Sequence, residues 1–212
     1  MFVLFLISCN QKVMDPGRSA QESRPSQEPT IWIMGDSYVR RGRDRAAETL
    51  GMNLGLPAQI QWFGQGGLRW DRLVPTFKQE LRRRSAPAVL LICCGSNDLG
   101  KIKSVELVAT MKRDLLDLHR QFPCMKIFIS ELSERRLWRD AKPGRINRAK
   151  NFINHVMRDF IVGLGGCMIR HPTIKFDCPG LFNQHAEDGT EPLSDVFTAV
   201  GCCCYPNSEL LG

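Results

Sequence analysis

The feature that most constrains the fold is a continuous apolar run at residues 88–94, Ala-Val-Leu-Leu-Ile-Cys-Cys, which lies between Pro87 and Gly95. A run of this length, bounded by residues that break helices, fits a β-strand better than a helix. Both faces of such a strand are apolar, so both must be covered, as they are in the central strands of parallel sheets. The run therefore predicts a central parallel strand with helices on each side of it.

The rest of the chain alternates short apolar runs with segments of helical periodicity. Further strands are predicted at residues 30–34, 58–63, 125–130 and 167–169, and helices at residues 43–54, 68–84, 104–121 and 146–162. Strands that alternate with helices in this way form a doubly wound parallel sheet with right-handed connections. We therefore predict an α/β fold with about five parallel strands.

Three details of the helices follow from single residues. Pro75 lies within the second predicted helix and is expected to limit its first turn or to break it. Ser104 precedes the most regular helical pattern of the chain and is expected to cap that helix. Phe152 is predicted to share the buried face of the last helix with Ile153, Val156, Met157 and Phe160.

The length of 212 residues suits one α/β domain with tails. Residues 11–29 are rich in Ser, Gln, Glu, Pro and Arg, so we expect a flexible segment at residues 1–29. The domain itself is expected at residues 30–200. Residues 201–212 begin with Gly-Cys-Cys-Cys and fit no regular pattern, so they are predicted to form an irregular tail.

The net charge of +7 comes largely from clusters of arginine. A basic surface of this kind suits anionic partners such as nucleic acid or an anionic lipid surface. Aromatic residues are sparse among the arginines, however, and a solvated basic face is the simpler interpretation. Binding of nucleic acid is therefore only weakly supported.

The nine cysteines include no C-x-x-C pair, so no metal site is expected. Their odd number and their position in apolar runs favour buried free thiols and a reducing compartment, and we expect a cytoplasmic protein. Secretion is the alternative, because an apolar run at residues 1–7 precedes Ser8-Cys9. No other stretch approaches the ~20 apolar residues of a membrane span, so no integral membrane association is expected.

Three polar loops directly follow three of the predicted strands. They read Gly-Asp-Ser at residues 35–37, where the chain then enters a helix, Gly-Gln-Gly-Gly at 64–67 and Gly-Ser-Asn-Asp at 95–98. The carboxyl ends of parallel strands meet at one edge of the sheet, where ligands bind in open α/β folds. We therefore expect the three loops to lie close together.

The side chains and amides of these loops suit acyl transfer. Ser37 offers a hydroxyl nucleophile, and the N–H groups of Ser37 and Gly67 and the side-chain amide of Asn97 are donors for the negatively charged oxygen of a tetrahedral intermediate. The structural alternative is that Ser37 only caps the following helix. Asp36 and Asp98 are expected to hold their turns by bonding neighbouring backbone amides.

In order and in position, these loops resemble the first three sequence blocks of the SGNH hydrolases, also called GDSL-like esterases. Ser37 and Asn97 are 60 residues apart, and the resemblance covers roughly residues 30–194. It implies a three-layer flavodoxin-like fold and a small carboxylic ester as substrate, with no metal or cofactor. Ser37 matches the family's nucleophile, and Gly67 and Asn97 match its oxyanion donors. Residues 62–70 and 179–182 further resemble SGNH domains encoded within fish mobile elements.

The fourth block is where the chain departs from the family pattern Asp-x-x-His. The matching stretch is Asp188-Gly-Thr-Glu191, and His185 lies three residues before Asp188. A serine hydroxyl needs a base with a pKa near 7, whereas the pKa of a glutamate is ordinarily about 4.3. Three interpretations stay open: full activity is lost, His185 replaces the missing base beside Asp188, or Glu191 acts as the base.

The other histidines are interpreted more simply. His119 lies near the end of a predicted helix, His155 lies mid-helix, and His171 precedes a proline in a loop. Each is expected to be structural or solvated.

Two functional hypotheses result. The first is a serine esterase-like hydrolase acting on small acyl or acetyl esters, with activity reduced or lost where the motif histidine is missing. The second is an inactive binding or interaction module of the same fold, associated with nucleic acid through its arginines.

Overall fold

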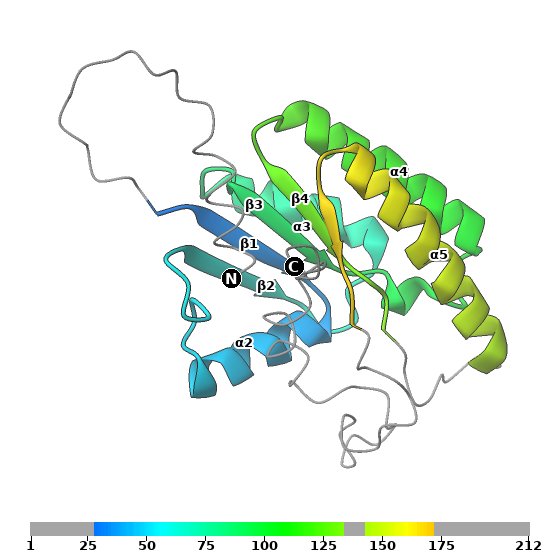
Figure 1. Ribbon diagram of the computed structural model, residues 1–212, viewed down its shortest axis with the longest axis horizontal. Helices are drawn as coiled ribbons and strands as arrows, with labels where there is room; N and C mark the ends of the chain where they lie inside the picture. Colours follow the sequence, from blue (N-terminus) through cyan, green and yellow to red (C-terminus); the bar gives the residue numbers. More distant parts are fainter. Residues whose placement is uncertain (1–27, 134–142, 172–212) are drawn as a thin grey trace, which may run out of the picture.

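The computed structural model describes residues 28–133 and 143–171 and contains a five-stranded parallel sheet (Figure 1). The strand order is β2-β1-β3-β4-β5. The strands are β1 (Thr30–Gly35), β2 (Gln59–Gly64), β3 (Val89–Cys93), β4 (Lys126–Ser130) and β5 (Cys167–Ile169). The prediction of an α/β fold with five parallel strands is confirmed.

Helices cover both faces of this sheet. They are α2 (Ser37–Thr49), α3 (Trp70–Leu81), α4 (Ser104–Gln121) and α5 (Pro143–Gly163), with a short 3-10 turn, η1 (Ser96–Asp98). Side chains of α3, α4 and α5 pack in one apolar cluster on one face, and α2 packs on the other face (Figure 1). The arrangement is a three-layer sandwich.

Strand β1 shows how the sequence builds the two layers. Trp32 and Met34 point into the larger cluster, whereas Ile31 and Ile33 belong to the smaller cluster on the opposite face. Successive side chains of a strand alternate between faces, so a strand buried on both sides needs an apolar residue at every position. Trp32 is fully buried, and its ring centroid lies 5.4 Å from that of Phe77 in α3.

The bounds of α2, α3 and α5 differ by a few residues from the sequence-based expectation, and the cap of α4 differs as well. Helix α2 ends at Thr49 rather than near residue 54, because Leu50 is its half-exposed C-terminal cap and Leu54 has a positive φ of 54°. Helix α4 begins with Ser104 as its first helical residue, so Lys103 and not Ser104 occupies the cap position. The expectation that Ser104 caps α4 was wrong.

Two further expectations about helices were wrong. Pro75 lies inside α3 without ending it. The buried residues Trp70, Leu73 and Phe77 anchor this helix before and after the proline, which removes only one backbone hydrogen bond. Phe152 is 41% exposed, because the buried face of α5 follows Ile146, Ile153, Met157 and Ile161 at helical spacing.

The predicted tails and the fourth sequence block fall largely outside the described residues. His185, Asp188 and Glu191 lie there, as do residues 201–212, so the domain limits and these side chains remain predictions. Among the helices that the structure describes, none is both long and apolar enough to cross a membrane.

Candidate active site

The first loop joins β1 tightly to α2. A side chain at Gly35 would meet the carbonyl oxygen of Cys93 at 2.1 Å, so only glycine fits where β1 passes β3. Asp36 then caps α2, because its Oδ1 accepts a hydrogen bond from the N–H of Tyr38 at 3.0 Å. Ser37 is therefore the first residue of the helix and not its cap, and it is buried. The alternative interpretation of Ser37 as a capping residue was wrong.

The second loop follows β2 and is exposed around its glycine pair. A side chain at Gly64 would meet the backbone N of Arg40 at 2.3 Å, so β2 passes α2 closely at this point. Gly67 has φ of +70°, a left-handed conformation that glycine adopts without strain, and nothing lies within 4 Å of a side-chain carbon added there. Backbone conformation, not lack of space, therefore requires glycine at position 67.

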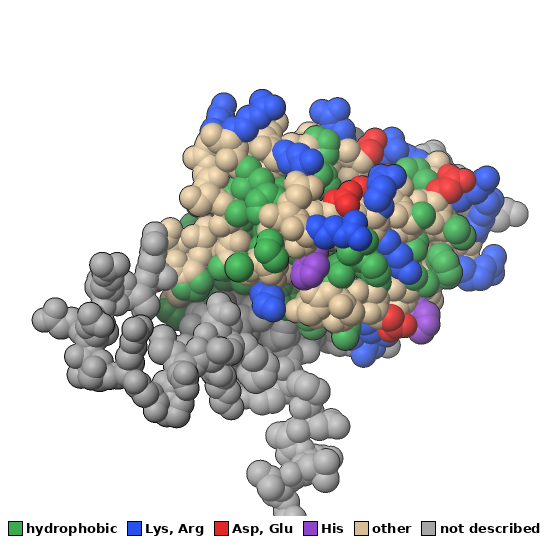
Figure 2. All heavy atoms as spheres, turned by 90° about the horizontal axis from the view of Figure 1, so that it is seen from above, with side chains coloured by type: hydrophobic (Ala, Val, Ile, Leu, Met, Phe, Trp, Pro, Cys, Tyr) green, Lys and Arg blue, Asp and Glu red, His purple; other side chains and the backbone are tan. Residues whose placement is uncertain are grey.

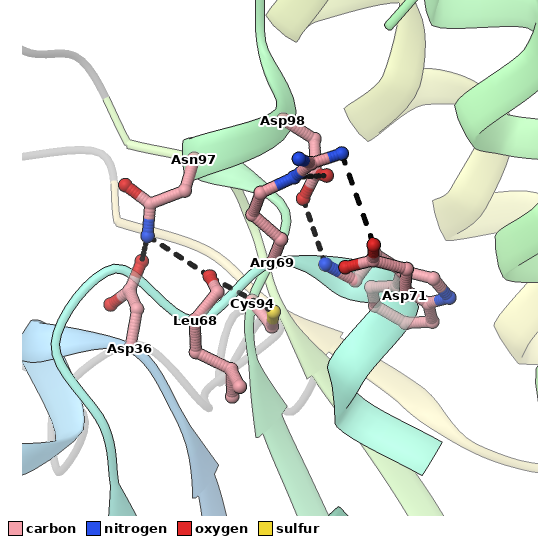
Figure 3. A network of polar contacts seen from close by, with 8 residues as sticks. Asp36, Leu68, Arg69, Asp71, Cys94, Asn97 and Asp98 are labelled. Atoms are coloured by element: carbon pink, nitrogen blue, oxygen red, sulfur yellow. Dashed lines mark hydrogen bonds and ion pairs between the residues drawn. The ribbon is translucent and has the colours of Figure 1, made fainter. Parts of the chain in front are cut away.

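Asn97 connects the three loops (Figure 3). Its Nδ2 donates to the carbonyl oxygen of Leu68 at 3.0 Å and to Oδ2 of Asp36 at 3.3 Å. Asp36 precedes Ser37 and Leu68 follows Gly67, so the loops lie side by side at one edge of the sheet. An amide nitrogen carries two hydrogens, and both are engaged here. Donation to a substrate oxygen therefore requires one of them to be released, and the longer bond to Asp36 is the weaker.

Asp98 also holds these loops together at the same edge of the sheet. Its carboxylate is fully buried and accepts from the backbone N–H of Trp70 at 2.9 Å and from Nε of Arg69 at 3.1 Å (Figure 3). The hydrogen bond that Arg69 donates to Asp98 raises the pKa of Arg69, and the charge of Asp71 acts in the same direction. Asp98 was expected to hold its own turn, but these partners belong to the loop after β2. Its effect is to tie that loop to η1.

The described residues include only part of the predicted site. Ser37, Gly67 and Asn97 lie within them, on loops that meet. The predicted base His185, its partner Asp188 and the alternative base Glu191 lie outside them. The predicted oxyanion donors are therefore described, and the predicted bases are not.

A cavity adjoins this edge at the ends of β3, β4 and β5. It has a volume of about 500 Å³, including space open to solvent, and is lined by residues that include Asp36, Cys93, Ser130, Glu131 and His171. Within it, the Nε2 atom of His171 lies 2.7 Å from Oγ of Ser130. The sequence analysis treated His171 as a loop histidine and did not consider Ser130. The rule that placed the three loops together could have found the pair, since each residue lies at or just beyond a strand's carboxyl end.

Comparison with known proteins gives a match at the level of fold. No protein-family model matches the sequence, and no curated protein matches it. Among solved structures, a GDSL-like lipase from Bacteroides thetaiotaomicron is 13% identical, with a TM-score of 0.64 over 86% of this chain and 89% of that chain. A member of the lipolytic protein G-D-S-L family from Veillonella parvula is 12% identical, with a TM-score of 0.62 over 82% and 94% of the two chains.

A third structure, an alpha/beta hydrolase enzyme from the metagenome of Lake Arreo, is 15% identical, with a TM-score of 0.57 over 84% of this chain and 97% of that chain. The sheet order and these matches therefore define the class at the level of the fold, which is that of GDSL-like hydrolases. This chain has that fold over most of its length, and the resemblance seen in the sequence motifs is confirmed at this level.

Proposed function

We propose that the protein hydrolyses small carboxylic esters through Ser37. The observation that carries this proposal is the pair of hydrogen bonds from Asn97 to Leu68 and Asp36, which holds the three loops at one edge. Loops that are held together before the reaction keep their donors close to the developing negative charge, and Asn97 donates to it after releasing its longer bond to Asp36. The backbone N–H groups of Ser37 and Gly67 and the Nδ2 atom of Asn97 are the proposed donors.

The proposed mechanism proceeds through an acyl-enzyme. Ser37 Oγ attacks the carbonyl carbon of the ester, its proton passes to the base, and the alcohol leaves with that proton. Water then hydrolyses the acyl-serine by the same route. His185 is the proposed base, with Asp188 orienting it, and Glu191 is the alternative base. This chemistry needs neither a metal ion nor an organic cofactor.

A fluorophosphonate probe followed by peptide mapping tests the proposal. We expect phosphonylation of Ser37 in the wild-type protein and none at residue 37 in Ser37→Ala. Ser85→Ala is the matched control, because Ser85 is exposed and precedes β3, whereas the third loop follows the opposite end of that strand. A wild-type protein that carries no label on Ser37 would contradict the proposed nucleophile.

The alternative function is an inactive binding module of the same fold. It is favoured by the missing motif histidine and by exposed arginines on α2 such as Arg43 and Arg45. These two form ion pairs with Asp44 at 2.8 Å and with Glu48 at 3.5 Å. Figure 2 also shows acidic side chains among the lysines and arginines on the face in view. A basic surface neutralised locally in this way gives less support to nucleic-acid binding.

The variant Glu191→His separates the two functions. In an otherwise intact site that lacks only its base, the new histidine should raise ester turnover by ~10²–10⁴-fold, the usual contribution of general base catalysis. An unchanged turnover would show that a missing base is not what limits the activity. Binding to a DNA duplex through the arginines should weaken as the salt concentration rises. If it does not weaken, the arginines do not account for the binding.

A further inference from the structure

A second serine–histidine pair lies at the carboxyl edge of the sheet, in the cavity beyond β3, β4 and β5. We propose that Ser130 and His171 form a nucleophile–base pair that reacts with small uncharged carboxylic esters, separately from Ser37. Ser37 follows β1 and Ser130 ends β4, and β3 lies between these strands. Neighbouring strands are about 4.8 Å apart, so the two serines are roughly 10 Å apart at the edge.

The geometry of the pair is that of an activated serine. Ser130 is the last residue of β4 and is paired in register with Ile169, the last residue of β5. His171 follows two residues later, and its Nε2 lies 2.7 Å from Ser130 Oγ. A hydroxyl and a base within about 2.6–3.2 Å of each other meet the requirement for proton transfer.

His171 is held in place through its backbone. Its N–H donates to Oε1 of Glu131 at 2.9 Å, and the N–H of Glu131 in turn donates to the carbonyl oxygen of Ile169 at 2.9 Å. The other carboxylate oxygen of Glu131 lies 4.0 Å from the guanidinium of Arg158 in α5. A base whose position is fixed by a third group is the recurring arrangement in serine catalysis.

A neutral imidazole with its ring proton on Nδ1 could accept the proton of Ser130, whose Oγ also lies 3.4 Å from the carbonyl oxygen of Glu131. His171 is 6% exposed, and burial lowers its pKa, an effect that the charge of Glu131 opposes more weakly. At pH 7 it is therefore neutral. Its Nδ1 is buried and has no hydrogen-bond partner among the described residues. With the ring proton on Nδ1, Nε2 is free to take the proton of Ser130.

Cys93, which also lines the cavity, does not compete as a nucleophile. Burial raises the pKa of its thiol to about 12, and the charge of Asp36 acts in the same direction. The thiolate is the reactive form of cysteine, and at this pKa almost none is present at pH 7. Ser130 is therefore preferred to Cys93 as the nucleophile, and its contact with His171 distinguishes it from Ser96 and Ser133, which also line the cavity.

The cavity suits a small uncharged ester. Part of its space of about 500 Å³ is open to solvent, so a ligand can enter it from outside. The carboxylates of Asp36 and Glu131 in its wall disfavour an anionic ligand. Its apolar wall includes Leu91, Leu132 and Ile169.

Hydrolysis of an ester at Ser130 needs no co-reactant other than water. Ser130 Oγ forms a bond to the carbonyl carbon while its proton moves to Nε2 of His171. The bond between that carbon and the alcohol oxygen then breaks, and the alcohol leaves with the proton from Nε2. Water attacks the acyl carbon of the resulting Ser130 ester and gives a proton to Nε2. The carboxylic acid is released as Ser130 Oγ takes that proton back.

Mapping of fluorophosphonate-labelled residues on the full-length chain tests the pair. We expect label on Ser130 in the wild-type protein and in Ser37→Ala, which shows that it is independent of the first site. In His171→Gln the labelling rate at Ser130 should fall ~100-fold, because general base catalysis contributes at least this much. Ser85→Ala, an exposed serine that does not line the cavity, should leave the rate unchanged.

Two readouts keep the test decisive where a variant folds poorly. In the wild-type protein alone, 4-nitrophenyl acetate should compete with the probe at Ser130, and the labelling rate at Ser130 should fall as His171 is protonated below pH 6.5. Absence of label at residue 130, or a His171→Gln variant labelled at the wild-type rate, would overturn the pair. Label on Ser37 alone would overturn it while leaving the proposed function intact.

Discussion

The two halves of the sheet's carboxyl edge differ in the part of serine chemistry that we propose for them. At β1, β2 and β3, the hydrogen bonds of Asn97 and Asp98 fix a set of loops, and the proposed bases of Ser37 lie outside the described residues. At β4 and β5, Ser130 lies 2.7 Å from Nε2 of His171, its proposed base. Charge stabilisation and proton transfer are separate requirements. We propose that different ends of one edge meet them.

The largest effect is expected from Asn97→Ala, which tests whether the two halves of the edge act independently. Loss of one oxyanion donor usually lowers kcat by ~10²–10³-fold, so labelling of Ser37 and the ester turnover that depends on it should fall by that factor. Labelling of Ser130 should not change. A parallel loss at both serines, measured by quantitative peptide mapping, would mean that the two halves are not independent.

The next largest effect is on stability, in Asp98→Ala. This change leaves the N–H of Trp70 buried without an acceptor and removes the partner of Arg69. A buried N–H without an acceptor costs about 1–3 kcal/mol, and Arg69 is partly exposed and adds little, so the free energy of unfolding in urea should fall by about 2 kcal/mol. Asp114→Ala is the control.

In Asp114→Ala, the Nε1 atom of Trp70 loses its hydrogen-bond acceptor, Oδ2 of the partly buried Asp114. The expected loss is about 1 kcal/mol, because a typical hydrogen bond contributes about that much. A loss in Asp114→Ala equal to that in Asp98→Ala would contradict the role of Asp98 in tying the second loop to η1.

A smaller effect is expected from Gly67→Ala. Space is available, but φ of +70° costs a residue with a side chain roughly 1–2 kcal/mol. Stability should fall by about this amount, and labelling of Ser37 should slow as the loop relaxes, while Ser130 is unaffected. Gly66→Ala is the matched control and should change neither, because the nearest atom to an added side-chain carbon is 3.9 Å away.

The smallest effect concerns the pH dependence that His171 gives to stability. Its pKa is lowered on folding from about 6.5, so the unfolded chain binds the proton more readily. The stabilisation from the neutral imidazole is therefore present above pH 6.5 and is lost as pH falls towards the folded pKa. Glu131, Arg158, Cys93 and Asp36 are the charged or titratable groups nearest to it in the cavity or its wall.

Urea unfolding of wild type and His171→Gln between pH 7.5 and 5 measures this dependence. The difference in stability between the two proteins should shrink as pH falls. A difference that stays constant would show that His171 does not titrate with a lowered pKa.

Much of the fold could be predicted because the strands carry strong local signals. The apolar run of β3 dictates a strand buried on both sides, and alternation with helices dictates a parallel sheet. The meeting of the three loops follows from that topology alone. Local patterns could not predict the effects of packing. Examples are the continuation of α3 through Pro75 and the exposure of Phe152.

The site was predictable only where a motif marked it. Asp98 bonds residues 28 and 29 positions earlier in the chain, and this long-range partnership is not visible in the turn where it lies. The contact between Ser130 and His171 depends on the pairing of β4 with β5 and on their register. Neither serine nor histidine stands in a recognisable motif there, so only the assembled sheet shows them together.

The most direct measurement of the central claim is a crystal structure of the protein after reaction with a fluorophosphonate. We predict phosphorus bonded to Ser37 Oγ, with the phosphoryl oxygen about 2.7–3.1 Å from the N–H groups of Ser37 and Gly67 and from Nδ2 of Asn97. In that complex Asn97 should have released its contact with Asp36. A phosphonylated Ser37 whose phosphoryl oxygen points to solvent, with Asn97 still bonded to both Leu68 and Asp36, would contradict an oxyanion site at this edge.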